Sequence, residues 1–114
     1  MEQSKQPSRD PQVVAVYLTF PDEKVAQEVS RALVERRLAA CVNLGALGTS
    51  VYRWEGKVTT EPEVVAWAKT TRGRLPELLR AVEELHPYDV PAAVAYPATG
   101  GLAEYLGWVE EETA

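Results

Sequence analysis

Two side chains of this sequence, one thiol and one imidazole, belong to types that bind transition metals or act as nucleophiles, and each type occurs once. Cys41 lies in the segment Ala-Ala-Cys-Val-Asn, and His86 begins the segment His-Pro-Tyr-Asp-Val-Pro. Nucleophilic catalysis needs a matching base, and cofactor chemistry leaves recognisable motifs. The sequence has no second histidine, no paired cysteines and no Walker-type loop, so we expect a protein that is not an enzyme.

Composition limits the class of protein further. With 114 residues, 46% of them hydrophobic and 25% charged, the chain fits one globular domain, which we place at 13–114 behind a mobile, polar tail at 1–12. The net charge of -5 opposes nucleic-acid binding, and no apolar run approaches the roughly 20 residues of a membrane span. A single cysteine cannot form an internal disulfide, so a reducing compartment, the cytoplasm, is expected.

Periodicity predicts the elements that position these residues. The segment 13–20 is almost entirely apolar, which predicts a central strand. Asp22 is placed to cap a helix whose apolar face carries Val25, Val29 and Leu33. A second amphipathic helix is predicted over 75–85, with Pro76 in its first turn and Pro87 after its end.

The middle and the end of the chain are predicted to contribute further strands. Residues 38–44 and 50–58 read as strands separated by Gly45 and Gly48, which are turn or bulge positions. A turn is expected at Glu61-Pro62, followed by a strand at 64–70 that could also be the return arm of a long hairpin. A short strand at 92–96 and a terminal helix over 102–109 complete the order β-α-β-β-(β)-α-β-α.

This order is typical of an α+β fold, the ferredoxin-like split βαβ sandwich, in which an antiparallel sheet carries both long helices on one face. The other face is left bare, and Tyr52, Trp54 and Trp67 are among the residues that two helices could not all cover. Burying apolar area is worth roughly 25 cal/mol per Å². We therefore expect these three aromatic residues to lie in an interface between copies of the chain.

Several uncommon segments resemble the CutA family of divalent-cation tolerance proteins. The resemblance spans Val13 to Glu112, and the segments that carry it are 39–43, 50–57, Glu63, 69–71, His86-Pro87-Tyr88 with Pro91, Gly101, Tyr105-Leu106 and Trp108. It implies a ferredoxin-like subunit, a homotrimer assembled through strand edges, and a link to metal-ion tolerance and copper binding. It implies no settled enzymatic reaction.

Cys41, Glu63 and His86 match family positions that could supply metal ligands. Copper(I) prefers sulfur, whereas copper(II) accepts nitrogen and oxygen. The three residues are far apart in sequence, so only folding or trimer assembly could bring them together, and no cofactor is expected to be needed for folding. Ala92 stands where relatives carry glutamate, which removes a carboxylate near His86.

Simpler interpretations remain open at this point. Cys41 could be a small buried hydrophobic residue, His86 could cap a helix C-terminus, and the tryptophans could serve packing. Two other functions also remain. A PII-like trimeric sensor would bind a nucleotide or anion between subunits, with donors from Thr70, Thr71, Arg72 and Arg74. A non-catalytic trimeric scaffold would instead bind other proteins.

Overall fold

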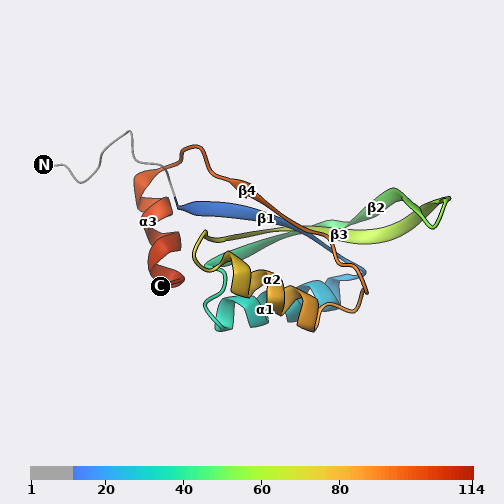
Figure 1. Ribbon diagram of the computed structural model, residues 1–114, viewed down its shortest axis with the longest axis horizontal. Coiled ribbons are helices and arrows are strands. Elements are labelled where there is room, and N and C mark those ends of the chain that lie inside the picture. The colour runs from blue at the N-terminus through green and yellow to red at the C-terminus, as the bar shows by residue number, and fades with distance from the viewer. Residues whose placement is uncertain (1–11) are drawn as a thin grey trace, which may run out of the picture.

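The computed structural model describes residues 12–114 and contains one sheet and three helices in that range (Figure 1). The predicted tail at 1–12 lies outside the described residues except for its last residue. The elements, in chain order, are β1 (Val13–Phe20), α1 (Glu23–Glu35), β2 (Cys41–Trp54), β3 (Lys57–Thr71), α2 (Leu75–Leu85), β4 (Ala93–Pro97) and α3 (Ala103–Glu112).

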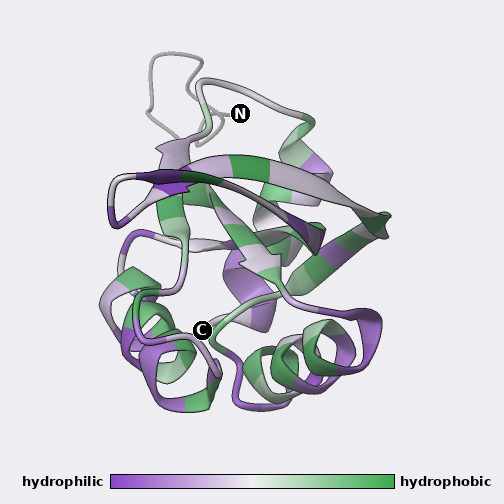
Figure 2. Cartoon of the chain, turned by 90° about the vertical axis from the view of Figure 1, so that its right-hand side faces the viewer, coloured by the Kyte–Doolittle hydropathy of each residue, from purple (hydrophilic) through white to green (hydrophobic). Residues whose placement is uncertain are grey.

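The sheet has the order β2-β3-β1-β4, and all its neighbouring strands are antiparallel. Helices α1 and α2 both cover one face of it, while α3 lies at one end (Figures 1 and 2). The α+β class and the split βαβ strand order predicted from the sequence are confirmed. β1 is a central strand, as its apolar sequence predicts.

The main core lies between the sheet and the two long helices. Helix α1 begins where predicted, because the Asp22 carboxylate accepts a hydrogen bond of 2.8 Å from the backbone N–H of Val25. The largest fully buried side chains come from β1, β3 and the apolar faces of the helices: Phe20, Leu18, Leu33, Leu78, Val16, Val64, Val82, Val109 and Thr70. Helical periodicity therefore identified the buried faces of α1 and α2 correctly.

The predicted strand at 50–58 is correct for 50–54, which end β2, and for 57–58, which begin β3, but it misses the turn between them, and the predicted turn at Glu61-Pro62 is wrong. The chain reverses at Glu55 and Gly56, whose φ angles are 50° and 80°, in a two-residue loop between the paired Trp54 and Lys57. The alternative of a long hairpin is confirmed. Pro62 is tolerated inside β3 because β1 pairs with β3 only from Val64 onward, so the preceding part of β3 has a free edge.

A bulge lies near the base of this hairpin, where one of the two predicted glycines is needed. Leu44 pairs with Ala66 and Leu47 pairs with Val64, so two residues of β2 stand opposite one residue of β3. A Cβ atom at Gly45 would lie 3.2 Å from the backbone oxygen of Val65, which explains glycine there. Gly48 pairs regularly and was wrongly assigned as a possible bulge.

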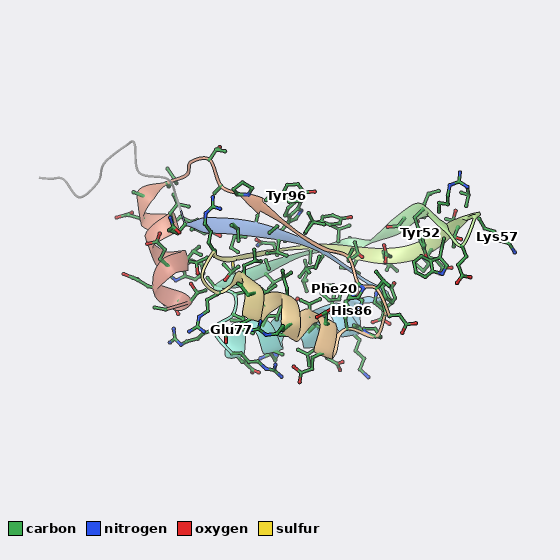
Figure 3. All side chains as sticks on the ribbon, viewed as in Figure 1. Phe20, Tyr52, Lys57, Glu77, His86 and Tyr96 are labelled. Atoms are coloured by element: carbon green, nitrogen blue, oxygen red, sulfur yellow. The ribbon has the colours of Figure 1, made fainter. Side chains whose placement is uncertain are left out.

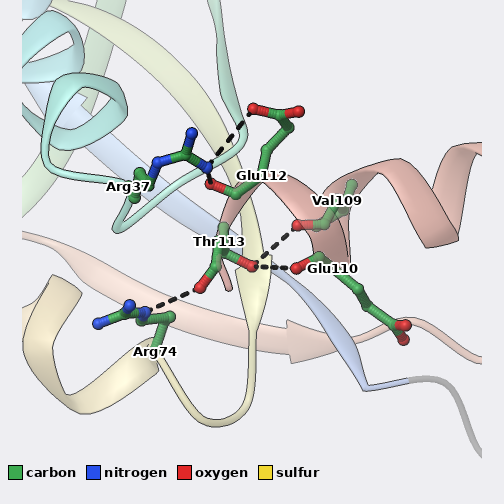
Figure 4. A network of polar contacts seen from close by, with 6 residues as sticks. All are labelled: Arg37, Arg74, Val109, Glu110, Glu112 and Thr113. Atoms are coloured by element: carbon green, nitrogen blue, oxygen red, sulfur yellow. Dashed lines mark hydrogen bonds and ion pairs between the residues drawn. The ribbon is translucent and has the colours of Figure 1, made fainter.

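Two arginines, one just after α1 and one just before α2, form hydrogen bonds with the C-terminal end of α3 (Figure 4). Arg37 follows α1 with a φ of 60°, a position that usually belongs to glycine, and its guanidinium donates to the carbonyl of Glu112 at 3.1 Å. The Nε of Arg74 donates to the carbonyl of Thr113 at 2.8 Å. These contacts hold α3 over a second, small core around the fully buried Val109.

Candidate functional site

A pocket of about 620 Å³ opens where the β2–β3 hairpin leaves the sheet, a size in the usual range for ligand sites. Its wall comes from the end of β1, from the hairpin and from the loop between α2 and β4. The lining residues are Tyr17, Thr19, Ser50, Val51, Tyr52, Trp54, Glu61, Glu63, Tyr88, Asp89, Val90 and Ala92. Among the described residues 12–114, this lining includes aromatic rings and three carboxylates but no lysine or arginine, so it favours a positively charged ligand.

The three carboxylates come from two segments. Glu61 and Glu63 are two residues apart on β3 and therefore lie on the same face, and Asp89 lies on the loop that follows α2. Sequence reasoning found only Glu63, because it read Glu61 as part of a turn and did not place Asp89 beside the hairpin. Ala92, on the loop before β4, also lines the pocket.

Tyr88 connects two of the sequence-predicted ligands. Its hydroxyl donates to Oε2 of Glu63 at 3.0 Å, and its backbone N–H donates to Nδ1 of His86 at 3.1 Å. Burial, and after it the hydrogen bond to Glu63, raise the pKa of Tyr88 to about 12. The phenol therefore stays protonated, as a donor to the carboxylate, throughout the neutral pH range.

His86 lies just beyond α2 and is almost completely buried, with 6% of its surface exposed. Its backbone N–H donates to the carbonyl of Val82 at 2.9 Å, so His86 is the C-terminal cap of α2 through its backbone. The imidazole ring does not contact the carbonyls at the end of α2. Its Nε2 instead lies 2.7 Å from the carbonyl oxygen of Thr19 on β1.

Cys41 lies far from the other two predicted ligands. It pairs with Lys69, six residues along β3 from Glu63, which corresponds to about 20 Å at about 3.3 Å per residue. Its side chain is half-buried, so it is not the fully buried hydrophobic residue of the simpler interpretation. Its Sγ lies 3.4 Å from the hydroxyl of Tyr105, and this contact, followed by burial, raises the pKa of Tyr105 to about 12.

The fold of one chain therefore does not bring the predicted ligands together. Between residues 12 and 114, no three histidine, cysteine, aspartate or glutamate side chains are arranged to hold a metal ion. Glu63 and His86 are linked through Tyr88, whereas Cys41 is separate from both. The pocket carboxylates alone do not form a complete coordination site within one chain.

The predicted interface residues are exposed, but in two places. Tyr52 and Trp54 lie on the hairpin, with 42% and 51% of their surfaces exposed. Trp67, 39% exposed, lies on the open face of the sheet between Tyr17 and Tyr96, at ring-centroid distances of 5.5 and 5.9 Å. Figure 3 shows Tyr96 on the side of the sheet opposite α1 and α2.

The donors that a nucleotide or anion sensor would use are partly occupied within the chain. Thr70 is fully buried. The guanidinium of Arg74 already contacts the carbonyl of Thr113 and, at 2.9 Å, the carboxylate of Glu77. The backbone N–H of Arg72 donates to the carbonyl of Gln12 at 2.9 Å. The guanidinium of Arg74 is therefore already paired, whereas the buried hydroxyl of Thr70 has no hydrogen-bond partner among the described residues.

Comparison with known proteins gives a consistent result. The family described as CutA1 divalent ion tolerance protein matches residues 14–112. A divalent-cation tolerance protein CutA from Thermus thermophilus is 48% identical over 98 residues, covering 86% of this chain and 95% of that protein. Protein CutA from Mus musculus is 46% identical over 101 residues, covering 89% of this chain but 57% of the longer mouse protein.

Solved structures agree with the fold. The divalent cation tolerance protein Cut A1 from Thermus thermophilus superposes with a TM-score of 0.87 at 46% identity, covering 90% of this chain and 99% of that one. The names of other similar proteins give different compartments: one from Arabidopsis thaliana is called chloroplastic, and one from Archaeoglobus fulgidus is called periplasmic. Within the described range of this chain, no helix is long and apolar enough to cross a membrane.

Proposed function

Because this chain belongs to the family of CutA1 divalent ion tolerance proteins, we propose that it takes part in divalent-cation tolerance by binding a cation, copper among them, as a homotrimer. The match to the family over residues 14–112 carries this proposal. The protein binds the ion without catalysing a reaction. The cytoplasm is its proposed compartment, on the basis of the single cysteine.

The cation binds in the hairpin pocket, at the carboxylates of Glu61, Glu63 and Asp89. Carboxylate oxygens suit divalent cations, including copper(II), and no positive side chain from the part of the chain that the structure describes lines the pocket to repel one. Since these groups do not complete a coordination site within one chain, a second copy supplies the remaining ligands. Cys41 lies at the other end of the sheet, so its thiolate joins such a site only from another subunit.

Three features support the trimer. The open face of the sheet exposes Trp67 beside Tyr17 and Tyr96, and Tyr17 also lines the pocket, so the aromatic surface and the pocket are continuous. Strands β2 and β4 present free edges that can pair with another chain. The hairpin adds exposed apolar side chains, including Val51 and Trp54, that would be unfavourable in water.

Calorimetric titration of chelator-treated protein with copper(II) tests the cation site. Saturation near one ion per chain is expected, with binding weakened about 10-fold or more by Glu63→Gln or Asp89→Asn because each removes a charged oxygen donor. Glu83→Gln is the matched control, since this glutamate is exposed on α2 and outside the pocket. Equal affinity in all three variants would contradict the pocket as the site.

Cys41→Ser completes the series. If the thiolate joins the site from another subunit, this variant loses affinity for copper(I) more than for copper(II), because the softer ion prefers sulfur. Unchanged copper(I) binding would remove Cys41 from the proposed ligand set and leave the carboxylate site standing.

A further inference from the structure

We infer that His86 is a positioning residue rather than a metal ligand: it fixes the backbone of Tyr88, and Tyr88 in turn holds the carboxylate of Glu63 at the pocket wall. The role of Glu63 in binding a cation rests on the proposed function. The chain of contacts from His86 to Glu63 does not, so the two can be tested separately.

Both ring nitrogens of His86 already have partners. The carbonyl oxygen of Thr19 can only accept, so Nε2, at 2.7 Å from it, carries the proton. The N–H of Tyr88 can only donate, so Nδ1, at 3.1 Å, supplies the lone pair. The imidazole is therefore the neutral Nε2–H tautomer, and a metal ion would have to displace a backbone hydrogen bond to reach either nitrogen.

The ring is also held on its faces and by the backbone. It stacks on Phe20 with a centroid distance of 5.1 Å and an interplanar angle of 15°, and the ring of Tyr88 lies 4.6 Å away on a tilted plane. Phe20 is fully buried, so turning the imidazole toward the pocket would disturb the main core. Pro87 restricts His86 to an extended conformation, and its ψ is 139°.

Tyr88 links the fixed imidazole to a carboxylate of the pocket. With its backbone fixed by His86, its hydroxyl reaches Oε2 of Glu63, 25 residues earlier in the chain, at 3.0 Å. One carboxylate oxygen is thereby held while the other remains for a ligand in the pocket. A carboxylate that is already ordered loses less conformational freedom on binding, and partners of this kind commonly change metal affinity by about 10- to 100-fold.

The single histidine makes a direct test possible, because imidazole nitrogen NMR then gives one set of signals. In the metal-free, full-length protein at neutral pH we expect the Nε2–H tautomer, with both nitrogen signals unchanged when zinc(II) is added. An Nδ1–H or charged ring, or a zinc-dependent shift of either nitrogen signal, would overturn the inference. Absence of any zinc or copper binding would count against the proposed function. The observed tautomer would still test whether His86 positions Tyr88.

Three substitutions distinguish a positioning role of His86 from a role as a metal ligand. His86→Gln keeps one donor and one acceptor but removes the imidazole, so copper(II) affinity should stay within about 3-fold of wild type, whereas His86→Ala and Tyr88→Phe should each lose about 10-fold. A loss in His86→Gln as large as that in His86→Ala would identify the imidazole as a ligand.

Discussion

Replacing Trp67 by threonine should break the proposed trimer while leaving the subunit folded. This indole is the middle member of the aromatic row on the open face of the sheet, flanked by Tyr17 and Tyr96. Threonine suits a β-strand, so β3 should keep its pairing with β1 and β2. The substitution therefore removes apolar surface that another copy of the chain would cover in the proposed trimer.

The magnitude follows from the exposed area. A tryptophan presents up to about 250 Å², so the 39% of Trp67 that is exposed amounts to about 100 Å², worth about 2.5 kcal/mol per subunit when covered. Three subunits give about 7.5 kcal/mol, or a factor of about 3 × 10⁵ in the trimer dissociation constant. Because the concentration at half-dissociation varies as the square root of that constant, it should rise about 500-fold.

Sedimentation over a dilution series measures this shift directly. Trp108→Ala is a matched control, because Trp108 is also 39% exposed but lies on α3, away from the open face of the sheet. Thermal unfolding of each variant separates loss of assembly from loss of the fold. A wild-type chain that sediments as a folded monomer at micromolar concentration would refute the reasoning, as would equal shifts for the two tryptophans.

Three further predictions concern stability. Folding raises the pKa values of Tyr88 and Tyr105 from 10.0 to about 12, so their contribution to stability should be complete below pH 10 and be lost as pH rises toward 12. Guanidine unfolding between pH 8 and pH 11.5 should therefore show a smaller loss of unfolding free energy in the Tyr88→Phe, Tyr105→Phe double variant than in wild type. Arg37→Ala should destabilise by about 1 kcal/mol, whereas Arg37→Gly, which also relieves the positive φ, should stay within about 0.5 kcal/mol of wild type by urea unfolding. Chelator should leave the melting temperature unchanged, whereas copper(II) at 100 times its Kd should add about 2.7 kcal/mol; a fall with chelator would show that folding needs the metal.

Helices and central strands could be predicted because burial leaves a regular trace in the sequence. The apolar residues of α1 recur every four positions and meet the core, and the continuous apolar run of β1 reflects its central place in the sheet. The sequence signal for the hairpin turn is weaker, because Glu55-Gly56 is not one of the residue pairs that usually form two-residue turns. Pro62 and Gly48 gave stronger but misleading signals, whereas Gly45 does lie at a bulge.

The site was harder to predict because a side chain's type does not reveal its partners. The sequence gives His86 the chemistry of a ligand, yet the fold places its ring between Phe20 and Tyr88 with both nitrogens occupied. Glu63 was found through the family resemblance, whereas Asp89 enters the pocket only because the loop after α2 passes beside the hairpin. Contacts of that kind depend on tertiary structure and have no local pattern.

The hairpin is the part of the described chain that has the least packing within a single subunit. Beyond the point where Phe20 pairs with Val64, β2 and β3 continue as a two-stranded ribbon, and none of the three helices described within residues 12–114 lies against it. Such ribbons are marginally stable in water, and this one exposes Val51, Trp54 and Val58. The same ribbon supplies Glu61 and Glu63 to the pocket, so any partner that orders the hairpin also orders two of the three carboxylates. Assembly and cation binding should therefore be coupled: the trimer should bind the ion more tightly than the dissociated Trp67→Thr subunit, and the ion should favour the trimer by the same factor.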